Sequence, residues 1–195
     1  MTKPKSICVY CASSSRVDEC YTHAAHLLGK LIAQKNMQLI TGGGVQGLMR
    51  AVEDGALEAN GIVTGVIPRF MMEQGWNHPA LTNMHVTPDM HTRKKLMAEL
   101  SDAVIALPGG CGTMEELCEI ITWKQLGLYL KPIVILNINE YYNPLIAQFE
   151  KAIDQHFMGQ IHGKIWSVAH TPQEAMDIIE QTPEWSPEIR KYAAL

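Results

Sequence analysis

The stretch Ala103-Val104-Ile105-Ala106-Leu107-Pro108-Gly109-Gly110-Cys111-Gly112-Thr113-Met114-Glu115-Glu116 joins an apolar run to a glycine-rich turn and a helix start. A short apolar run bounded by turn residues predicts a buried strand, here residues 103–107. The glycines leave backbone N–H groups uncovered, and a helix N-terminus adds unpaired donors and partial positive charge. A strand followed by such a turn is typical of a phosphate site in a parallel α/β sheet.

Strands and helices alternate along the rest of the chain. Strands are predicted at residues 7–10, 38–41, 62–67 and 133–136, and helices at residues 18–35, 45–59, 89–101, 113–128, 144–158 and 172–181. The connection from Arg69 to Val86 is expected to be a loop without regular structure that serves as a lid or binding segment. The pattern predicts a single α/β domain over residues 1–195, with a doubly wound, mostly parallel, Rossmann-like sheet and a loosely packed C-terminal tail from about residue 183.

The composition limits the class of protein. The chain has 195 residues, of which 47% are hydrophobic, and it carries a formal net charge of -4. Such a chain can bury one sizeable core, and its charge is unlike that of a nucleic-acid-binding protein, so no nucleic-acid partner is expected. No apolar stretch near the start is long enough for a signal peptide or a membrane span, so we expect a cytoplasmic protein without a membrane partner.

The spacing of cysteines and histidines argues against a metal site. Cys8 and Cys11 have the spacing of a redox or zinc motif, but they lie along a predicted strand and no second pair follows. His23 and His26 lie on a predicted helix with only Glu19 nearby as a carboxylate. We therefore expect no metal ion and interpret Cys8 and Cys11 as small buried side chains.

Two other loops follow strands at the edge where such a sheet binds ligands. The loop Cys11–Ser15 is rich in hydroxyl groups, so Ser14 either binds a phosphate or caps the following helix. The loop Gly42-Gly43-Gly44-Val45-Gln46-Gly47 matches the G-x-G-x-x-G pattern of dinucleotide-binding proteins. It follows the second strand, however, and the strand at residues 62–67 ends without an Asp or Glu for a ribose hydroxyl, so this match alone is weak evidence.

Two charged residues point to chemistry near the first glycine turn. Glu116 lies one turn inside the predicted helix, where it would repel a bound phosphate, so it indicates a reaction on the group that carries the phosphate. Met90, Arg93 and Met97 fall at positions i, i+3 and i+7 of a predicted helix, which places Arg93 on the stripe that faces the protein. A buried arginine needs an anionic partner, either a bound phosphate, Glu116 or a purely structural carboxylate.

These residues carry a specific resemblance. The run Met90-His91-Thr92-Arg93-Lys94, followed by the run Pro108–Glu116, resembles the M-x-x-R-K and P-G-G-x-G-T-x-x-E signature of the Lonely Guy (LOG) family of phosphoribohydrolases. Further matching segments include Gly42–Met49 and Thr122–Gly127, in the same order along the chain.

The resemblance implies hydrolysis of the N-glycosidic bond of a nucleoside 5'-monophosphate, either AMP or a cytokinin riboside 5'-monophosphate, to the free base and ribose 5-phosphate. It implies that Arg93 and Glu116 are the catalytic pair, that Lys94 supports binding and that Gly110–Thr113 hold the phosphate. The expected substrate-binding residues are Ser14, Gly43, Gly44, Met90, Lys94, Gly109, Gly110, Cys111, Gly112, Thr113 and Thr122. Glu116 would stabilise positive charge at the anomeric carbon or activate the attacking water.

The resemblance also implies a homodimer or a higher homo-oligomer, formed through the helix near Trp123–Leu128. It places Thr122 near the ligand, yet Thr122 lies about 120° away from Glu116 around the helix axis. We therefore expect Thr122 to serve the site of a partner subunit.

Some alternatives stay open. A non-catalytic nucleotide or cofactor carrier could use the same glycine loops, although it would not need an inward Arg93 beside Glu116. A lysine decarboxylase, a label attached to this family, would need pyridoxal phosphate on a Schiff-base lysine; no lysine has that sequence context, so no cofactor is expected. The acid that protonates the leaving base is open between Asp89, His91, Glu73 and solvent, and the preferred base is also open.

Overall fold

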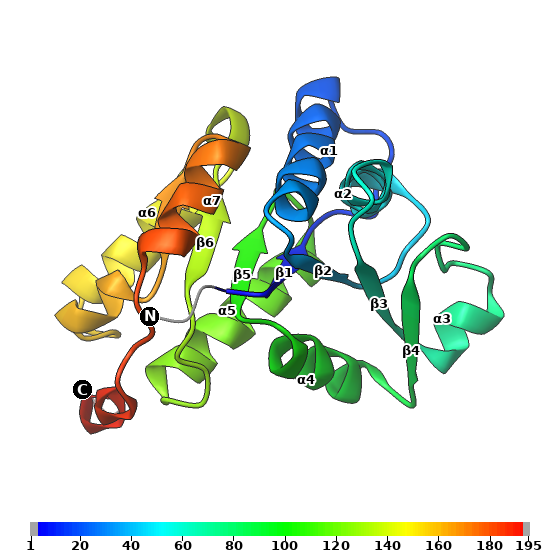
Figure 1. Cartoon of the computed structure of the whole chain (residues 1–195). Helices are drawn as coiled ribbons and strands as arrows, with labels where there is room; N and C mark the ends of the chain where they lie inside the picture. The colour runs from blue at the N-terminus through cyan, green and yellow to red at the C-terminus, as the bar shows by residue number, and fades with distance from the viewer. Residues whose placement is uncertain (1–3, 193–195) are drawn as a thin grey trace.

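The computed structural model describes residues 4–192 and contains one seven-stranded sheet (Figure 1). The strands are β1 (Ser6–Tyr10), β2 (Gln38–Thr41), β3 (Val63–Pro68), β4 (Asn83–Thr87), β5 (Ala103–Ala106), β6 (Ile133–Leu136) and β7 (Ser167–Ala169). They lie in the order β4-β3-β2-β1-β5-β6-β7, and each neighbouring pair is parallel. The predicted Rossmann-like α/β fold is confirmed, and the described sheet is wholly rather than mostly parallel.

Helices cover both faces of the sheet. Their bounds are α1 (Glu19–Gln34), α2 (Gly47–Glu58), α3 (Arg69–Glu73), α4 (Met90–Leu100), α5 (Cys111–Gln125), α6 (Asn143–Asp154) and α7 (Pro172–Gln181), with 3-10 turns η1 (Ile138–Glu140), η2 (Gln160–Lys164) and η3 (Pro187–Tyr192). Helices α1, α2 and α7 enclose one core, and α4, α5 and α6 enclose the other. Within residues 4–192, no helix has the length and apolar character that a membrane span needs.

Strand β1 shows how the sequence builds two cores. Its side chains alternate, so Val9 packs in the core under α1 and α2 while Cys8 and Tyr10 pack in the core under α4 and α5. Cys11 returns to the first core. Both cysteines are buried on opposite faces of the sheet, which confirms their interpretation as small core side chains.

The connection from Arg69 to Val86 contains regular structure, contrary to the prediction. Helix α3 occupies its start, and its end forms β4, an edge strand paired with β3. The sequence of β4, Asn-Met-His-Val-Thr, alternates polar and apolar residues but holds only two apolar side chains, and the strand is largely exposed at the edge of the sheet, so its sequence signal is weak. The three-residue edge strand β7 was missed because it is too short to show any period.

Several helix boundaries differ from the prediction by two or more residues, among them the start of α5 and the end of α6. Helix α5 begins at Cys111, two residues earlier than expected, because Gly110 takes an extended conformation and serves as the N-cap (φ -83°, ψ -159°). Helix α6 ends at Asp154, and His156 then adopts a left-handed conformation with φ 63°. In α5, the early start that follows from the Gly110 N-cap places backbone N–H groups of the glycine turn in the first turn of the helix.

The segment after residue 183 makes specific contacts, which differ from the loosely packed tail expected. The Trp185 N–H donates to the Leu130 carbonyl at 2.8 Å, and the Arg190 guanidinium donates to the Gly127 carbonyl at 3.0 Å. Ile189 is buried beside them. The sequence signal for this packing is a single apolar residue between charges, and residues 193–195 lie outside the described residues.

Candidate active site

The turn between β5 and α5 lies at the carboxyl edge of the sheet, and two tyrosines hold it from the β6 side. The Tyr142 hydroxyl donates to the Leu107 carbonyl at 2.7 Å, and the Tyr141 hydroxyl donates to the Gly109 carbonyl at 2.6 Å. Tyr142 is 1% exposed. These bonds anchor the last residue before the turn and its first glycine, so the turn has a rigid base.

The glycines of this turn have different reasons for lacking a side chain. A Cβ atom at Gly109 would lie 2.1 Å from the Thr113 hydroxyl oxygen, so Gly109 is required by the packing of buried Thr113. A Cβ atom at Gly110 or Gly112 would meet nothing within 4 Å. Their backbone is therefore uncovered beside the first-turn N–H groups of α5, which is the arrangement by which helix N-termini bind anions.

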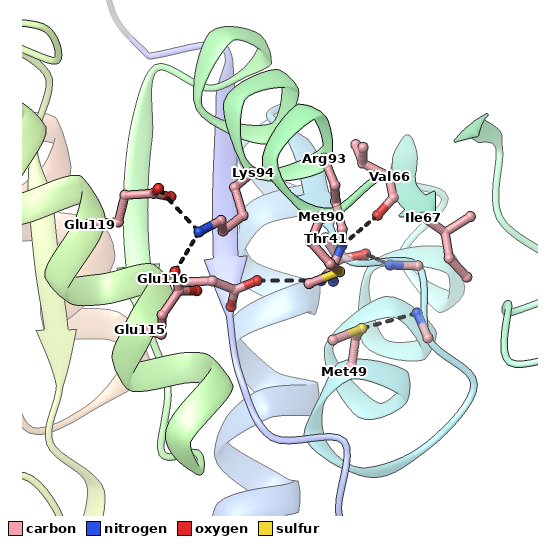
Figure 2. Close-up of polar contacts among 12 residues, drawn as sticks. Thr41, Met49, Val66, Ile67, Met90, Arg93, Lys94, Glu115, Glu116 and Glu119 are labelled. Carbon is pink, nitrogen blue, oxygen red and sulfur yellow. Dashed lines mark hydrogen bonds and ion pairs between the residues drawn. The ribbon is translucent and has the colours of Figure 1, made fainter. Parts of the chain in front are cut away.

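Arg93 on α4 is 6% exposed, as its position on the apolar stripe predicts. Its Nε donates to the Val66 carbonyl at 3.0 Å, and its Nη1 lies 3.6 Å from Glu116 Oε1 (Figure 2). A Cβ atom at Gly42 would lie 1.9 Å from Arg93 Nη2. The guanidinium is thus anchored at the end of β3 and packed against the second glycine loop, with one edge turned toward Glu116.

Glu116 on α5 is 9% exposed, and its environment opposes its charge. Burial raises its pKa to about 7; the Arg93 guanidinium lowers the pKa, and the neighbouring Glu115 carboxylate raises it. The attraction of Arg93 therefore offsets only part of the desolvation. Near neutral pH the carboxyl group exchanges between its acid and carboxylate forms, a range suited to proton transfer or charge stabilisation.

Lys94 adjoins this pair but is directed along α5. Its ammonium group donates to the Glu115 carboxylate and, at 3.1 Å, to Glu119 Oε1 (Figure 2). Burial lowers the pKa of Lys94, and the two hydrogen bonds outweigh that effect and raise it overall. In this structure Lys94 ties α4 to the first turns of α5.

The second glycine loop lies on the other side of Arg93. The Gly43 N–H donates to the Thr41 hydroxyl at 3.0 Å, and the Gly43 carbonyl accepts from the His78 N–H at 2.9 Å. The Gly44 N–H donates to the Met49 sulfur at 3.0 Å (Figure 2). Gly43 has φ 69°, a left-handed conformation in which a side chain is strained.

Two pockets open along this edge of the sheet. The arginine pocket, with a volume of about 300 Å³, is lined by Ser13, Gly42, Gly44, Val45, Gln46, Met49, Ile67, Met71, Trp76 and Arg93. The glycine-turn pocket, with a volume of about 140 Å³, is lined by Ala12, Ser14, Val17, Tyr21, Leu48, Pro108, Gly109, Gly110 and Tyr141. Because Ser13 and Ser14 are consecutive, the two pockets adjoin at the loop after β1.

The expected site residues fall into two groups. Arg93 and the second glycine loop line the arginine pocket, the first glycine turn lines the glycine-turn pocket, and Glu116 lies beside Arg93 without lining either pocket. Thr122 lies apart from them: it is exposed on α5, lines neither pocket, and its hydroxyl donates to the Cys118 carbonyl at 2.8 Å.

Three other expected residues lie at the margins of the site. Met90 is 38% exposed, and its sulfur lies 3.8 Å from Arg93 Nη1. Cys111 is exposed at the start of α5. Ser14 accepts from the Arg16 N–H at 3.3 Å and therefore stabilises a turn, whereas Asp18 is the N-cap residue of α1.

Several contributors were missed from the sequence. The Val66 carbonyl holds Arg93, which side-chain chemistry cannot reveal. Met71 and Trp76 were not missed: they line the arginine pocket from the connection that was expected to serve as a lid or binding segment. Tyr141 supports the turn across 32 positions of sequence, a distance over which no local pattern gives a signal.

Within the described residues, no three His, Cys, Asp or Glu side chains are grouped so that they could hold a metal ion. The buried lysines of the described chain are Lys94 and Lys124. Lys124 donates to the Lys131 carbonyl at 2.8 Å and lies 5.0 Å from the Trp185 ring centroid, on the C-terminal side of α5. With Lys94 bound by carboxylates, neither amine fits a Schiff-base site for pyridoxal phosphate.

Comparison with known proteins finds relatives over most of this chain. A protein from Oryza sativa subsp. japonica named probable cytokinin riboside 5'-monophosphate phosphoribohydrolase LOGL2 is 41% identical over 190 residues, which cover 97% of this chain and 77% of that protein. This chain belongs to the LOG family. A protein from Rhodococcoides fascians, named cytokinin riboside 5'-monophosphate phosphoribohydrolase, is 46% identical over 80% of this chain and 79% of its own length. A family model described as possible lysine decarboxylase matches residues 49–179.

Solved structures resemble this LOG-family chain over nearly its whole length. The molybdenum cofactor carrier protein of Chlamydomonas reinhardtii has a TM-score of 0.71 at 27% identity and covers 92% of this chain and 98% of its own. The molybdenum cofactor binding protein of Rippkaea orientalis has a TM-score of 0.69 at 26% identity, with 92% and 96% covered. The fold is therefore shared between proteins named as hydrolases and proteins named as carriers.

Proposed function

We propose that this LOG-family chain is a phosphoribohydrolase that splits the N-glycosidic bond of a nucleoside 5'-monophosphate and releases the free base and ribose 5-phosphate. The observation that carries the proposal is the buried Arg93–Glu116 pair, 3.6 Å apart, beside an uncovered glycine turn. The names of its relatives support the same reaction class.

The proposed chemistry follows from the charge that develops in the reaction. As the bond between the anomeric carbon and the base nitrogen breaks, positive charge grows on the ribose ring, and the Glu116 carboxylate stabilises it. Water adds its hydroxyl group to the anomeric carbon, and its proton leaves through Glu116 or solvent. The base departs with the bonding electron pair and takes up a proton.

The proposed binding mode assigns each end of the nucleotide to one pocket. The phosphate binds at Gly110–Thr113, where the first-turn N–H groups of α5 are available. The base lies toward the arginine pocket, whose walls include Met49, Met71 and Trp76. Phosphate binding would then supply the energy that aligns the ribose with Arg93 and Glu116.

We also propose that the protein acts in the cytoplasm as a homodimer. Leu128, at the C-terminal side of α5, is 65% exposed, and Leu126 beside it is 42% exposed. Exposed leucines directly after the helix that carries Thr122 support an interface there, from which Thr122 would reach the partner's site.

A cofactor or nucleotide carrier is the second candidate, favoured by the similarity to the molybdenum cofactor carrier protein. A carrier binds its ligand without consuming it. Incubation of the purified protein with AMP and with isopentenyladenosine 5'-monophosphate, followed by chromatography, separates the two functions. Equal amounts of base and ribose 5-phosphate are expected from the preferred nucleotide, whereas intact nucleotide in both reactions would favour the carrier.

A further inference from the structure

A buried carboxyl group that the proposed chemistry does not use lies behind the second glycine loop. Glu53 on α2 is 0% exposed, and no salt bridge to it occurs within the described residues. Its Oε1 accepts from the Thr41 hydroxyl at 2.5 Å, and its Oε2 has no partner in the described part of the chain. Burying a carboxyl group costs free energy, so this position requires a compensating role.

The Thr41 hydroxyl connects Glu53 to the loop. A hydroxyl group has one proton to donate and lone pairs that accept. The Gly43 N–H donates to Thr41 Oγ1 at 3.0 Å, so the hydroxyl proton goes to Glu53 at the end of β2. The result is a directed chain of hydrogen bonds from the Gly43 amide through Thr41 to Glu53.

The residue next to Glu53 holds the same glycine from its other side. His78 Nδ1 accepts from the Ala80 N–H at 3.2 Å, so Nε2 carries the proton and donates to Asp54 Oδ1 at 3.0 Å. The His78 backbone N–H donates to the Gly43 carbonyl. The consecutive residues Glu53 and Asp54 of α2 therefore fix the backbone N–H and the backbone carbonyl of Gly43, through Thr41 and His78 respectively.

The glycine loop held in this way positions Arg93. Gly42 packs directly against the Arg93 guanidinium, and Gly44 lines the arginine pocket. Gly43 lies close to the sheet, since a Cβ atom there would lie only 3.2 Å from the Gly65 Cα. A displacement of the loop would open the Arg93 side of the pocket.

We propose that Glu53 is a positioning residue of the nucleotide site, which orients the Thr41 hydroxyl so that the Gly42–Gly44 loop is held against Arg93. This inference rests on the proposed function, since it assigns Glu53 to the same site. Glu53 touches neither the nucleotide nor the reacting atoms and acts only through Thr41 and the loop.

Two matched pairs of variants test the chain of hydrogen bonds. Glu53→Leu and Thr41→Val remove a link while keeping side-chain size, and Glu53→Gln and Thr41→Ser keep an acceptor and a hydroxyl. Glu53→Leu and Thr41→Val, the removing variants, are each expected to lower kcat/KM for nucleotide hydrolysis about tenfold, because a small misplacement of a binding group is costly. Glu53→Gln and Thr41→Ser are expected to keep kcat/KM close to that of wild type. Glu58→Leu, at an exposed position of α2, controls for loss of charge on the helix.

A double variant separates positioning from general damage to the fold. If Glu53 acts through Thr41, Glu53→Leu/Thr41→Val lowers kcat/KM no further than the more severe single variant. Multiplied losses, or a folded Glu53→Leu protein with wild-type kcat and KM, would overturn the proposal. If Glu53→Leu does not fold, the Thr41→Val and Thr41→Ser pair decides.

Calorimetric measurement of the affinity for AMP tests the role of Glu53 without relying on turnover. If wild type binds AMP without releasing adenine, the hydrolase proposal fails; the positioning role then predicts weaker AMP binding for the removing variants only. Equal AMP affinity in wild type and the four single variants of Thr41 and Glu53, with equal kcat/KM wherever turnover occurs, would overturn the role of Glu53 itself.

Discussion

Arg93 Nη1 lies 3.6 Å from Glu116 Oε1, and both side chains are buried. This separation is longer than a direct hydrogen bond, so each group keeps hydrogen-bonding capacity for a ligand. The fixed end of Arg93 is Nε, bound to the Val66 carbonyl. The pair is thus held by the backbone of β3 and by α5 rather than by mutual contact.

Replacing Arg93 by lysine tests whether the shape of the guanidinium matters as well as its charge. Lysine cannot bond the Val66 carbonyl through a fixed Nε and face Glu116 at the same time. We expect Arg93→Lys to lower kcat/KM by about 10- to 100-fold, and Arg93→Ala to lower it further. Steady-state kinetics with AMP measures both; equal activity of Arg93→Lys and wild type would show that charge alone suffices.

The pKa of Glu116 predicts a pH profile. Burial raises this pKa to about 7, and the carboxylate form is the one that stabilises positive charge on the ribose. The ionised fraction grows as pH rises through the pKa, so kcat/KM should rise between about pH 6 and 8 and then level off. An acidic optimum with activity falling through pH 7 would instead make the protonated Glu116 the active form.

Glu53 predicts how stability depends on pH. Burial raises its pKa to about 8, the Thr41 hydroxyl bond partly offsets this, and the Asp54 carboxylate adds to it. Between about pH 4.5 and 8 the folded protein holds a proton that the unfolded chain releases, so the free energy of unfolding falls as pH rises, by at most about 1.4 kcal/mol per pH unit.

Glu53→Gln has no titrating group at this position, so its stability should fall less over that range. Urea unfolding at pH 5, 6, 7 and 8 compares the two proteins, and Glu116 contributes with the same sign in both. Parallel curves for wild type and Glu53→Gln would contradict the raised pKa.

The two consecutive glycines of the β5–α5 turn, Gly109 and Gly110, should respond differently to alanine. At Gly109 a methyl group collides with Thr113, so Gly109→Ala is expected to destabilise the fold by about 1–3 kcal/mol. At Gly110 the methyl group meets open space, so stability is kept while the group projects beside the proposed phosphate position and raises KM. Thermal unfolding and kinetics distinguish them; a Gly110→Ala protein with unchanged KM would place the phosphate elsewhere.

The sequence predicted most of the sheet because its central strands are apolar runs between turn residues, as in Ile133–Leu136. It predicted a buried Arg93 because helical spacing reveals which face an element buries. It failed at β4, where an edge strand needs few apolar side chains, and at the start of α5, where Gly110 rather than Thr113 ends the turn.

Sequence patterns could not predict the hydrogen bonds that join one element to another. The bond from Arg93 to the Val66 carbonyl involves a backbone group that every residue carries. Glu53 looked like one carboxylate among several on a helix, and only the packing of α2 against β2 makes it a buried partner of Thr41.

The rate of adenine release from AMP by Glu116→Ala, measured beside wild type with AMP binding determined on the same samples, tests the central claim most directly. We predict that wild type releases adenine and ribose 5-phosphate in equal amounts, while Glu116→Ala still binds AMP and releases adenine at least about 100-fold more slowly. Equal rates for the two proteins, or no release by wild type, would contradict the assignment of Arg93 and Glu116 as the reactive pair of a phosphoribohydrolase.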